Sequence, residues 1–358
     1  MRILLAGQTF GPRNGPGVFT RNLARGLAAA GHEVTVALPA QPLPFTEGVR
    51  VVQVRAFSLA PLYRDVHVSI RSRSAAKRLL RDFKPDVVHV QDHYPLSRAI
   101  VRAASVPVVV TNHFLTENIS EQTWLGRVGA FNRFSWRLAL DVLNRASVVT
   151  APTKTAADIL VRDGVTRPVR AISCGVDTHR FSPGSGARKL GSGVYVGRLD
   201  RDKDVATLVE AVSMLDNVQL IVVGRGREER RLHALATAAV TFAGFVDDEK
   251  LVDELRSAEF FAIAGRAELQ SIATLEAMAC GLPVVAANAL ALPELVTSGI
   301  NGELFRPGDA ADCARAMEAV VARRGSWDAM SRMSRERAEQ HDISRTVAAY
   351  EKLYAELL

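Results

Sequence analysis

Residues 268–281 have the sequence Glu-Leu-Gln-Ser-Ile-Ala-Thr-Leu-Glu-Ala-Met-Ala-Cys-Gly, and this stretch says most about the fold. Its apolar residues recur at helical spacing and predict a short helix. We expect Ser271 and Thr274 to accept hydrogen bonds from backbone N–H groups of the first turn. Gly281 ends the helix, and the apolar run 283–287 predicts a buried strand after it.

Two carboxylates flank the predicted helix start. Glu268 precedes the helix, and Glu276, separated from it by seven residues, lies inside the helix. The N-terminus of a helix suits a phosphate, because its N–H groups and its dipole favour negative charge. A nucleotide sugar has phosphate at one end and a polyol at the other, so it fits this arrangement. An ordinary solvated glutamate before a helix fits the spacing equally well.

Length and composition indicate two globular domains. The chain has 358 residues, of which 48% are hydrophobic and 23% are charged. Its apolar runs are shorter than the ~18 residues that span a bilayer, and we expect residues 1–7 to form a buried strand rather than a secretory signal. Three cysteines without ligand spacing favour a reducing, cytoplasmic location.

Charge is divided unevenly between the two halves. Residues 1–183 contain 24 Lys and Arg against 12 Asp and Glu, a net charge of +12, and the other 175 residues contain 21 against 26, a net charge of −5. A basic half is typical of a domain that meets an anionic partner, such as a membrane surface, a phosphorylated acceptor or nucleic acid. We expect no nucleic-acid partner, because the sequence lacks a recognition motif for one.

Short apolar runs alternate with helical patterns along the chain, which predicts two doubly wound parallel sheets. The Gly-, Pro- and Ser-rich segment 175–186 predicts a linker. We assign residues 1–183 with 342–358 to a first domain and residues 188–341 to a second. Ligands are expected on loops at the carboxyl ends of the strands, in a cleft between the domains. The expected strands are 3–6, 33–38, 49–54, 87–90, 106–111, 147–151, 169–173, 193–197, 218–223, 240–242, 260–264 and 283–287.

Loops after several expected strands carry groups that suit an anion. The first strand leads into a glycine-rich loop ending in Gly15-Pro16-Gly17, whose spacing is not that of a dinucleotide-binding motif, so an oxidoreductase is disfavoured. Arg198 and Lys203 follow the first strand of the second half, where two cations can straddle a diphosphate. A metal site at Asp202 and Asp204 is less favoured, because Asp204 fits a helix N-cap equally well.

Together these segments resemble the retaining GT-B glycosyltransferases of family 4. The resemblance covers almost the whole chain and rests most on Glu268-x7-Glu276 followed by the segment 277–285. It implies an α/β protein in which two Rossmann-like doubly wound domains face each other across a cleft, with the C-terminal helix packing back on the first. It also implies transfer of a hexose from a nucleoside-diphosphate sugar to an acceptor hydroxyl, with retention of configuration and without a metal or other cofactor.

The resemblance assigns site residues by their place in these motifs. Arg198 and Lys203 are expected to hold the diphosphate, Glu276 the ribose and Glu268 the transferred sugar, while His113 approaches the sugar from the first domain. These cations, Glu268 and His113 are the expected catalytic residues. The remaining donor-binding residues are expected to contact the base, the phosphates or the sugar, and they are Gly15, Gly17, Val246, Gln270, Ser271, Ile272 and Thr274.

Residues 269–271 are Leu-Gln-Ser, where the family commonly has Gly-Phe-Gly. This version, with the segment 111–118, is similar to bacterial enzymes that glycosylate diacylglycerol or related lipids. We therefore favour a UDP-hexose donor and a membrane lipid as acceptor. The alternatives are a GDP-mannose-dependent mannosyltransferase, a soluble or glycan acceptor, a UDP-sugar epimerase of the same fold, and a non-catalytic protein that binds sugar nucleotides.

Two segments of the basic half fit an anionic membrane surface. Each basic side chain near such a surface contributes roughly 1 kcal/mol, and Trp or Phe beside Arg is typical of interfacial helices. The alternative is a core-facing helix with a solvated basic face. We expect peripheral attachment to the inner face of the membrane, through Arg71, Arg73, Lys77, Arg78, Trp124, Arg127 and Phe131.

Overall fold

The computed structural model describes residues 1–11, 14–41, 48–58, 67–114 and 129–358. The chain forms two compact units, Met1–Cys174 with Ile343–Leu358, and Gly175–Asp342. The first unit ends at residue 174 rather than at the expected 183. The segment between these positions belongs to the second unit because Val176 and Phe181 are buried in that unit's core.

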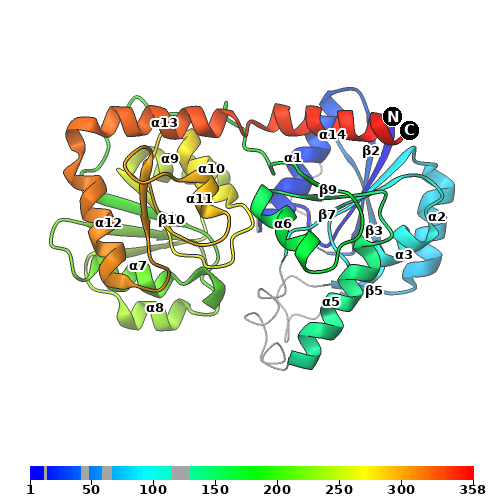
Figure 1. Cartoon of the computed structure of the whole chain (residues 1–358), viewed down its shortest axis with the longest axis horizontal. Coiled ribbons are helices and arrows are strands. Elements are labelled where there is room, and N and C mark those ends of the chain that lie inside the picture. The colour runs from blue at the N-terminus through cyan, green and yellow to red at the C-terminus, as the bar shows by residue number, and fades with distance from the viewer. Residues whose placement is uncertain (12–13, 42–47, 59–66, 115–128) are drawn as a thin grey trace. The chain divides into compact units, whose positions relative to one another are not determined.

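The first unit contains, within its described residues, a seven-stranded parallel sheet in the order β3-β2-β1-β6-β7-β8-β9 (Figure 1). The chain order reverses between β1 and β6, which makes their carboxyl ends a switch point where ligands commonly bind. A small antiparallel pair, β4 (Ala56–Ser58) and β5 (His67–Ser69), was not predicted. The strands of the large sheet are β1 (Arg2–Ala6), β2 (Glu33–Pro39), β3 (Arg50–Val54), β6 (Val87–Val90), β7 (Val108–Thr111), β8 (Val148–Ala151) and β9 (Val169–Ala171).

Helix α1 (Gly15–Ala29) begins earlier than the sequence indicates. The Asn14 side chain accepts a hydrogen bond of 2.9 Å from the Gly17 amide and caps the helix. Gly15 and Gly17 therefore lie in the first helical turn rather than in the expected glycine-rich loop. The C-terminal helix α14 (Ile343–Leu357) packs against α1, as expected, and a side chain at Gly26 would clash with Val347.

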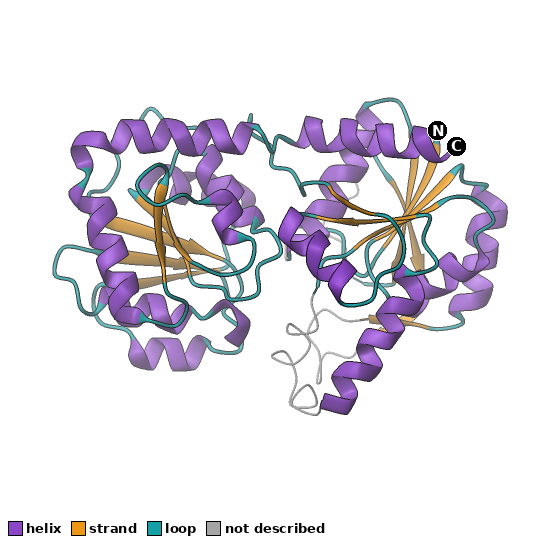
Figure 2. Cartoon of the chain, viewed as in Figure 1, coloured by secondary structure: helices purple, strands orange, loops and turns teal. Residues whose placement is uncertain are grey.

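The other helices of this unit flank its sheet (Figure 2). The apolar face of α2 is buried and its packing partner is α3, while α14 buries Tyr350 and Tyr354. Besides α1 and α14, the described helices of this unit are α2 (Ser72–Phe83), α3 (Pro95–Ala103), α5 (Gly129–Leu143) and α6 (Lys154–Arg162).

The second unit has a six-stranded parallel sheet in the order β12-β11-β10-β13-β14-β15. Its switch point lies between β10 and β13. Strand β15 was not predicted, since Gly-Glu-Leu-Phe lacks the continuous apolar run of its neighbours. The strands are β10 (Ser192–Val196), β11 (Gln219–Val223), β12 (Val240–Gly244), β13 (Phe260–Ile263), β14 (Val284–Ala287) and β15 (Gly302–Phe305).

Helix α10 (Ile272–Ala279) is the element that positions the candidate site. It follows β13, and Leu275, Ala277 and Met278 are fully buried in the core of the unit. Replacing a buried leucine such as Leu275 by alanine typically costs about 2–5 kcal/mol. The other helices of this unit are α7 (Val205–Val212), α8 (Glu229–Leu235), α9 (Asp248–Ser257), α11 (Leu292–Leu295), α12 (Ala310–Ala322) and α13 (Trp327–Glu339), with 3₁₀ turns at Arg201–Lys203 and Arg324–Ser326.

Candidate active site

The loop after β10 is held by close backbone packing. A side chain at Gly224 would clash with the Gly197 carbonyl, and one at Gly226 would clash with the Leu199 carbonyl. The buried Tyr195 hydroxyl donates a hydrogen bond of 2.8 Å to the Arg198 carbonyl. The two glycines of the loop after β11 therefore let it lie directly against the loop that carries Arg198.

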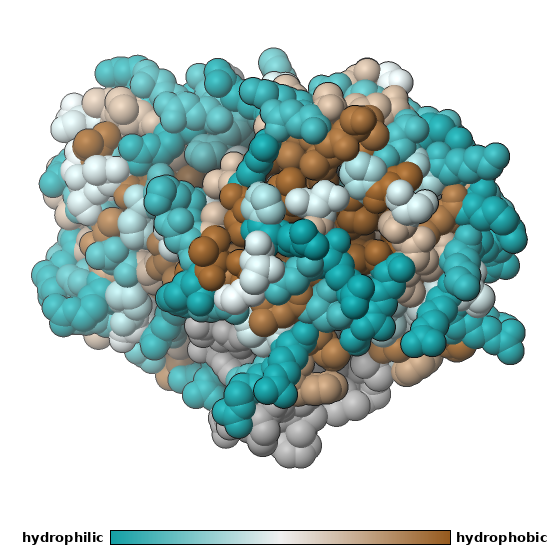
Figure 3. All heavy atoms as spheres, turned by 45° about the vertical axis from the view of Figure 1, so that its right-hand side comes forward, coloured by the Kyte–Doolittle hydropathy of each residue, from teal (hydrophilic) through white to brown (hydrophobic). Residues whose placement is uncertain are grey.

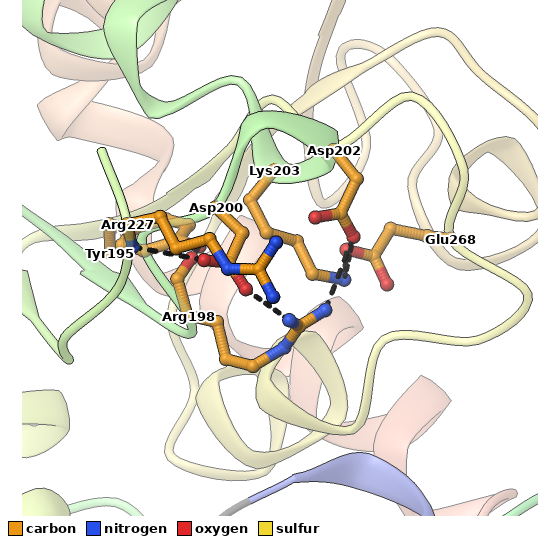
Figure 4. Close-up of polar contacts among 7 residues, drawn as sticks. All are labelled: Tyr195, Arg198, Asp200, Asp202, Lys203, Arg227 and Glu268. Carbon is orange, nitrogen blue, oxygen red and sulfur yellow. Dashed lines mark hydrogen bonds and ion pairs between the residues drawn. The ribbon is translucent and has the colours of Figure 1, made fainter. Parts of the chain in front are cut away.

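The expected phosphate-binding cations lie in one charged cluster with three carboxylates (Figure 4). Arg198 pairs with Asp200, and its second terminal nitrogen lies 3.4 Å from Asp202 Oδ2. Lys203 Nζ lies 2.7 Å from Glu268 Oε1 and 3.7 Å from Asp202 Oδ2. The structure thus brings together the predicted Arg198, Lys203 and Glu268, and it gives the five groups a formal net charge of −1.

Asp200 and Asp202 are site residues that were not predicted to contact the donor. The Asp202 side chain is only 2% exposed, and Asp200 Oδ1 also accepts a 3.1 Å hydrogen bond from the Arg227 amide. Acidic residues at every second position beside a cation could have indicated these ion pairs, because a short loop can bring its own carboxylates into contact with Arg198.

Asp204 does not cap a helix with its side chain, contrary to the sequence-based alternative. Its backbone is left-handed, and its carboxylate accepts hydrogen bonds from Arg266 instead. Asp202 is paired with Arg198 and Lys203. Within the described ranges, no group of three or more His, Cys, Asp or Glu side chains is arranged to hold a metal ion.

The N-terminus of α10 lies next to Glu268 in the chain. Ser271 Oγ accepts a hydrogen bond of 3.1 Å from the Thr274 amide, which confirms its role as the N-cap. Thr274 does not accept an N–H group as predicted, since its buried hydroxyl has no hydrogen-bond partner. Gln270 and Ser271 are buried, whereas Ile272 at the helix start and Glu276 on the second turn are half-buried.

The loop after β12 contains the residue expected to meet the base. Val246 is half-buried, and Phe245 beside it is 60% exposed. Gly244 has a φ of +67°, and a side chain there would lie 3.2 Å from the Arg225 guanidinium. Asp247 caps α9 by accepting a hydrogen bond of 2.9 Å from the Lys250 amide.

His113 follows β7 in the first unit and lies against α1. Its ring centroid is 5.0 Å from that of Phe19, and its Nε2 lies 2.9 Å from Gln91 Oε1. Desolvation lowers the pKa of His113 to about 3, so the imidazole is neutral at physiological pH. Gly17 lies in the same helix, and a side chain there would crowd the Gly11 carbonyl at 2.8 Å.

Gln91 and Asp92 follow β6 at the switch point of the first sheet and were not predicted as site residues. Burial raises the pKa of Asp92 to about 6, although its Oδ1 accepts a hydrogen bond of 2.9 Å from the Tyr94 amide. Gln91 Nε2 is buried without a hydrogen-bond partner, and the Asp92 carboxyl also interacts with the Ser97 side chain and the Gln8 backbone. A side chain at Gly7, after β1, would lie 3.6 Å from Asp92 Oδ2. Polar residues directly after a valine-rich strand were the signal available in the sequence.

The residues expected at a membrane surface are described in part. Arg71, Arg73, Lys77 and Arg78 are exposed at the start and on the outer face of α2, and hydrophilic residues cover much of the right-hand side of Figure 3. Among the described helices none is long and apolar enough to cross a bilayer. Trp124 and Arg127 lie outside the described residues, and Phe131 belongs to α5 without a described side chain.

Two doubly wound parallel domains, with a C-terminal helix returned to the first, define the GT-B class of glycosyltransferase folds. The model named Glycosyltransferase Family 4 matches residues 13–180, and the model named Glycosyl transferases group 1 matches residues 192–323. The chain belongs to this glycosyltransferase family.

Individual relatives agree with this assignment. The chain is 32% identical over 351 residues to D-inositol 3-phosphate glycosyltransferase of Acidothermus cellulolyticus, covering 86% of this chain and 78% of the relative. It is 26% identical over 344 residues to the sulfoquinovosyl transferase SQD2 of Arabidopsis thaliana, covering 90% of this chain but only 66% of that relative.

Solved structures share the fold over the full length of the chain. Sucrose-phosphate synthase of Thermosynechococcus elongatus has a TM-score of 0.85 at 21% identity, covering 100% of this chain and 99% of that one. Anabaena HepE, crystallised with UDP and glucose, has a TM-score of 0.82 at 20% identity and covers 100% of both chains. At these identities the likeness shows the fold alone.

Proposed function

We propose that the protein transfers a hexose from a nucleoside-diphosphate sugar, with a UDP-hexose favoured, to a hydroxyl group of an acceptor. The observation that carries this proposal is the cluster of Arg198, Lys203 and Glu268 on the loops after β10 and β13. Membership of a glycosyltransferase family supports the reaction class.

Donor binding requires an exchange of ion-pair partners in this proposal. Lys203 lies 2.7 Å from Glu268, and a diphosphate carries more charge than one carboxylate. When the diphosphate takes Lys203, the Glu268 carboxylate becomes available to accept hydrogen bonds from sugar hydroxyls. Asp202, buried between both cations, keeps them oriented during the exchange.

The chemical step separates charge, and the cluster stabilises one side of that separation. As the bond between the anomeric carbon and the diphosphate oxygen breaks, negative charge grows on the diphosphate. Arg198, Lys203 and the N–H groups at the start of α10 stabilise that charge. We propose retention by front-face attack, in which the acceptor oxygen bonds to the anomeric carbon and its proton passes to the departing diphosphate.

The first unit supplies groups that can form hydrogen bonds with hydroxyls in this proposal. His113, Gln91 and Asp92 offer hydrogen-bond donors and acceptors around the switch point. The exposed cations of α2 support a lipid acceptor, because they can hold the enzyme at an anionic membrane surface. Diacylglycerol is the acceptor that the resemblance favours.

A donor screen tests the proposal. UDP-glucose, UDP-galactose, GDP-mannose and ADP-glucose are each added at saturation, and the melting temperature is measured. A ligand at one hundred times its Kd stabilises the native state by about 2.7 kcal/mol. We expect the largest rise with a UDP-sugar, and a chain that no nucleotide sugar stabilises would contradict the proposal.

Product analysis then separates the remaining alternatives. The stabilising donor is incubated with diacylglycerol in mixed micelles, with glycerol, and without an acceptor. Glycolipid with the anomeric configuration of the donor is the expected product. A changed sugar nucleotide in the sample without acceptor identifies an epimerase, and inverted product rules out retention.

A further inference from the structure

Two ion pairs of opposite polarity join the loop after β10 to the loop after β13. Lys203 pairs with Glu268, and the next residue, Asp204, accepts hydrogen bonds of 3.0 and 2.8 Å at Oδ2 from Arg266 Nε and a terminal nitrogen. Adjacent residues of one loop thus contact two residues of the other, with positive and negative partners exchanged.

The backbone of Asp204 shows that this position is unusual. Asp204 has φ +47° and ψ +40°, the left-handed conformation that costs a non-glycine residue roughly 1–2 kcal/mol. Its side chain does not form a helix cap there. Glycine would adopt this conformation without strain, so the carboxylate at this position coincides with a strained backbone and an ion pair.

Arg266 is placed by a third loop. A side chain at Gly308, after β15, would clash with the Arg266 guanidinium, so that glycine leaves the space in which Arg266 lies. The Arg266 side chain is 54% exposed and the Asp204 side chain 17%. An isolated surface pair of this kind contributes only about 0–1 kcal/mol to stability. Its main role can therefore be one other than stabilising the fold.

We propose that Asp204 and Arg266 are positioning residues for donor binding, an inference that rests on the proposed function. When the diphosphate draws Lys203 away from Glu268, one of the two ion pairs opens. The second pair then holds the loop of Arg198 and Lys203 at a fixed spacing from the loop of Glu268. The distance between the cations and the sugar-binding carboxylate therefore stays suited to one donor molecule.

UDP binding to the full-length protein, measured by calorimetric titration, tests the proposal. Asp204→Gly removes the carboxylate without straining the backbone, and Arg266→Ala removes its partner. We expect each variant to bind UDP about three- to tenfold more weakly, and the double variant to bind no more weakly than either single one. The donor KM rises in parallel while the acceptor KM stays unchanged.

Two control variants separate positioning from a general loss of surface charge. Arg266→Lys keeps a cation that can reach the single carboxylate oxygen, so it retains UDP affinity within about twofold. Arg323→Ala breaks the Arg323–Glu303 pair, which has a 2.7 Å separation and similar exposures of 44% and 15%, and it leaves UDP affinity unchanged.

Three outcomes would overturn the inference. Unchanged UDP affinity in both single variants shows that the pair does not position the donor site. Tighter binding by Asp204→Gly with weaker binding by Arg266→Ala shows that Arg266 contacts the phosphates itself and that Asp204 only competes for it. Failure of the unmodified protein to bind any nucleoside diphosphate would contradict the proposed function as well as the role of this pair. Titration of the unmodified protein distinguishes this outcome from the first two, in which it still binds UDP.

Discussion

The candidate donor cluster of the second unit and the switch-point group of the first differ in their electrostatics. In the donor cluster, Arg198 and Lys203 are paired with carboxylates and form a network of full charges. At the switch point, His113 is neutral and the burial of Asp92 favours its protonated form. The first arrangement suits an anion that exchanges ion-pair partners, and the second suits hydroxyl groups that exchange hydrogen bonds. Substitutions should therefore separate donor binding from acceptor use.

The largest effect is expected from Lys203→Ala. This change removes a cation that stabilises the departing diphosphate and leaves Glu268 without a partner, so kcat/KM for the donor should fall by about 10²–10³. Steady-state kinetics and UDP titration measure it, with Lys203→Arg as the charge-conserving control. A loss below tenfold would show that Lys203 is not part of the donor site.

The double variant Lys77→Gln/Arg78→Gln tests the basic surface of the first unit. Two basic residues at an anionic leaflet contribute roughly 2 kcal/mol, so binding to phosphatidylserine vesicles should weaken by about thirtyfold in a sedimentation assay. The matched control, Lys154→Gln/Arg162→Gln, removes the same charge from α6 of the same unit. Equal losses in both variants would mean that α2 is not a membrane-binding face.

Buried histidines of the first unit should make the stability of the protein depend on pH. Burial lowers the pKa of His89 to about 3, and His89 hydrogen-bonds to Tyr354 at 2.6 Å and to Thr111 at 2.6 Å. Between pH 3 and 6.5 the unfolded chain therefore binds more protons at His89 than the folded chain does. The stability that depends on neutral His89 is complete above pH 6.5 and declines as the pH falls toward 3. The loss at pH 5 is about 2 kcal/mol.

Urea unfolding followed at pH 7, 6 and 5 measures this decline. His113 and His93 act in the same direction, because burial lowers their pKa values to about 3 and 4, whereas the raised pKa of Asp92 opposes them. The variant His89→Gln should be less stable at pH 7 but show a shallower dependence on pH. An unchanged slope would place the acid sensitivity elsewhere.

A smaller effect is expected from Asp92→Asn. The amide keeps a hydrogen-bonding group at the switch point but removes the buried acid, so kcat/KM for the acceptor should fall about tenfold while UDP affinity stays unchanged. Stability at pH 8 should rise, since the folded carboxyl has a raised pKa and ionises at a cost. A weaker affinity for UDP in this variant would show that the two regions do not divide donor from acceptor as proposed.

Most strands could be predicted from the sequence because central strands of a parallel sheet are buried on both faces. Strands β13 and β14 are continuous apolar runs for this reason. Strand β15 was not predicted because Gly302 and Glu303 interrupt its apolar run. The first turn of α1 was expected to be a loop because it contains two glycines and a proline, which are typical of loops, whereas Asn14 caps a helix that begins there.

The sequence by itself determined the two-domain α/β architecture, the candidate residues Arg198, Lys203 and Glu268, and the cap at Ser271. Periodicity, capping residues and motif order are local properties, so they can be recognised along the chain. Only the tertiary structure decided that Asp200 and Asp202 neutralise those cations, that Asp204 contacts Arg266, and that Gln91 meets His113. The Asp204–Arg266 and Gln91–His113 contacts join loops after different strands, so they depend on how the sheets bring distant segments together. The Asp200 and Asp202 contacts form within the loop after β10, whose conformation is held by the loop packed against it.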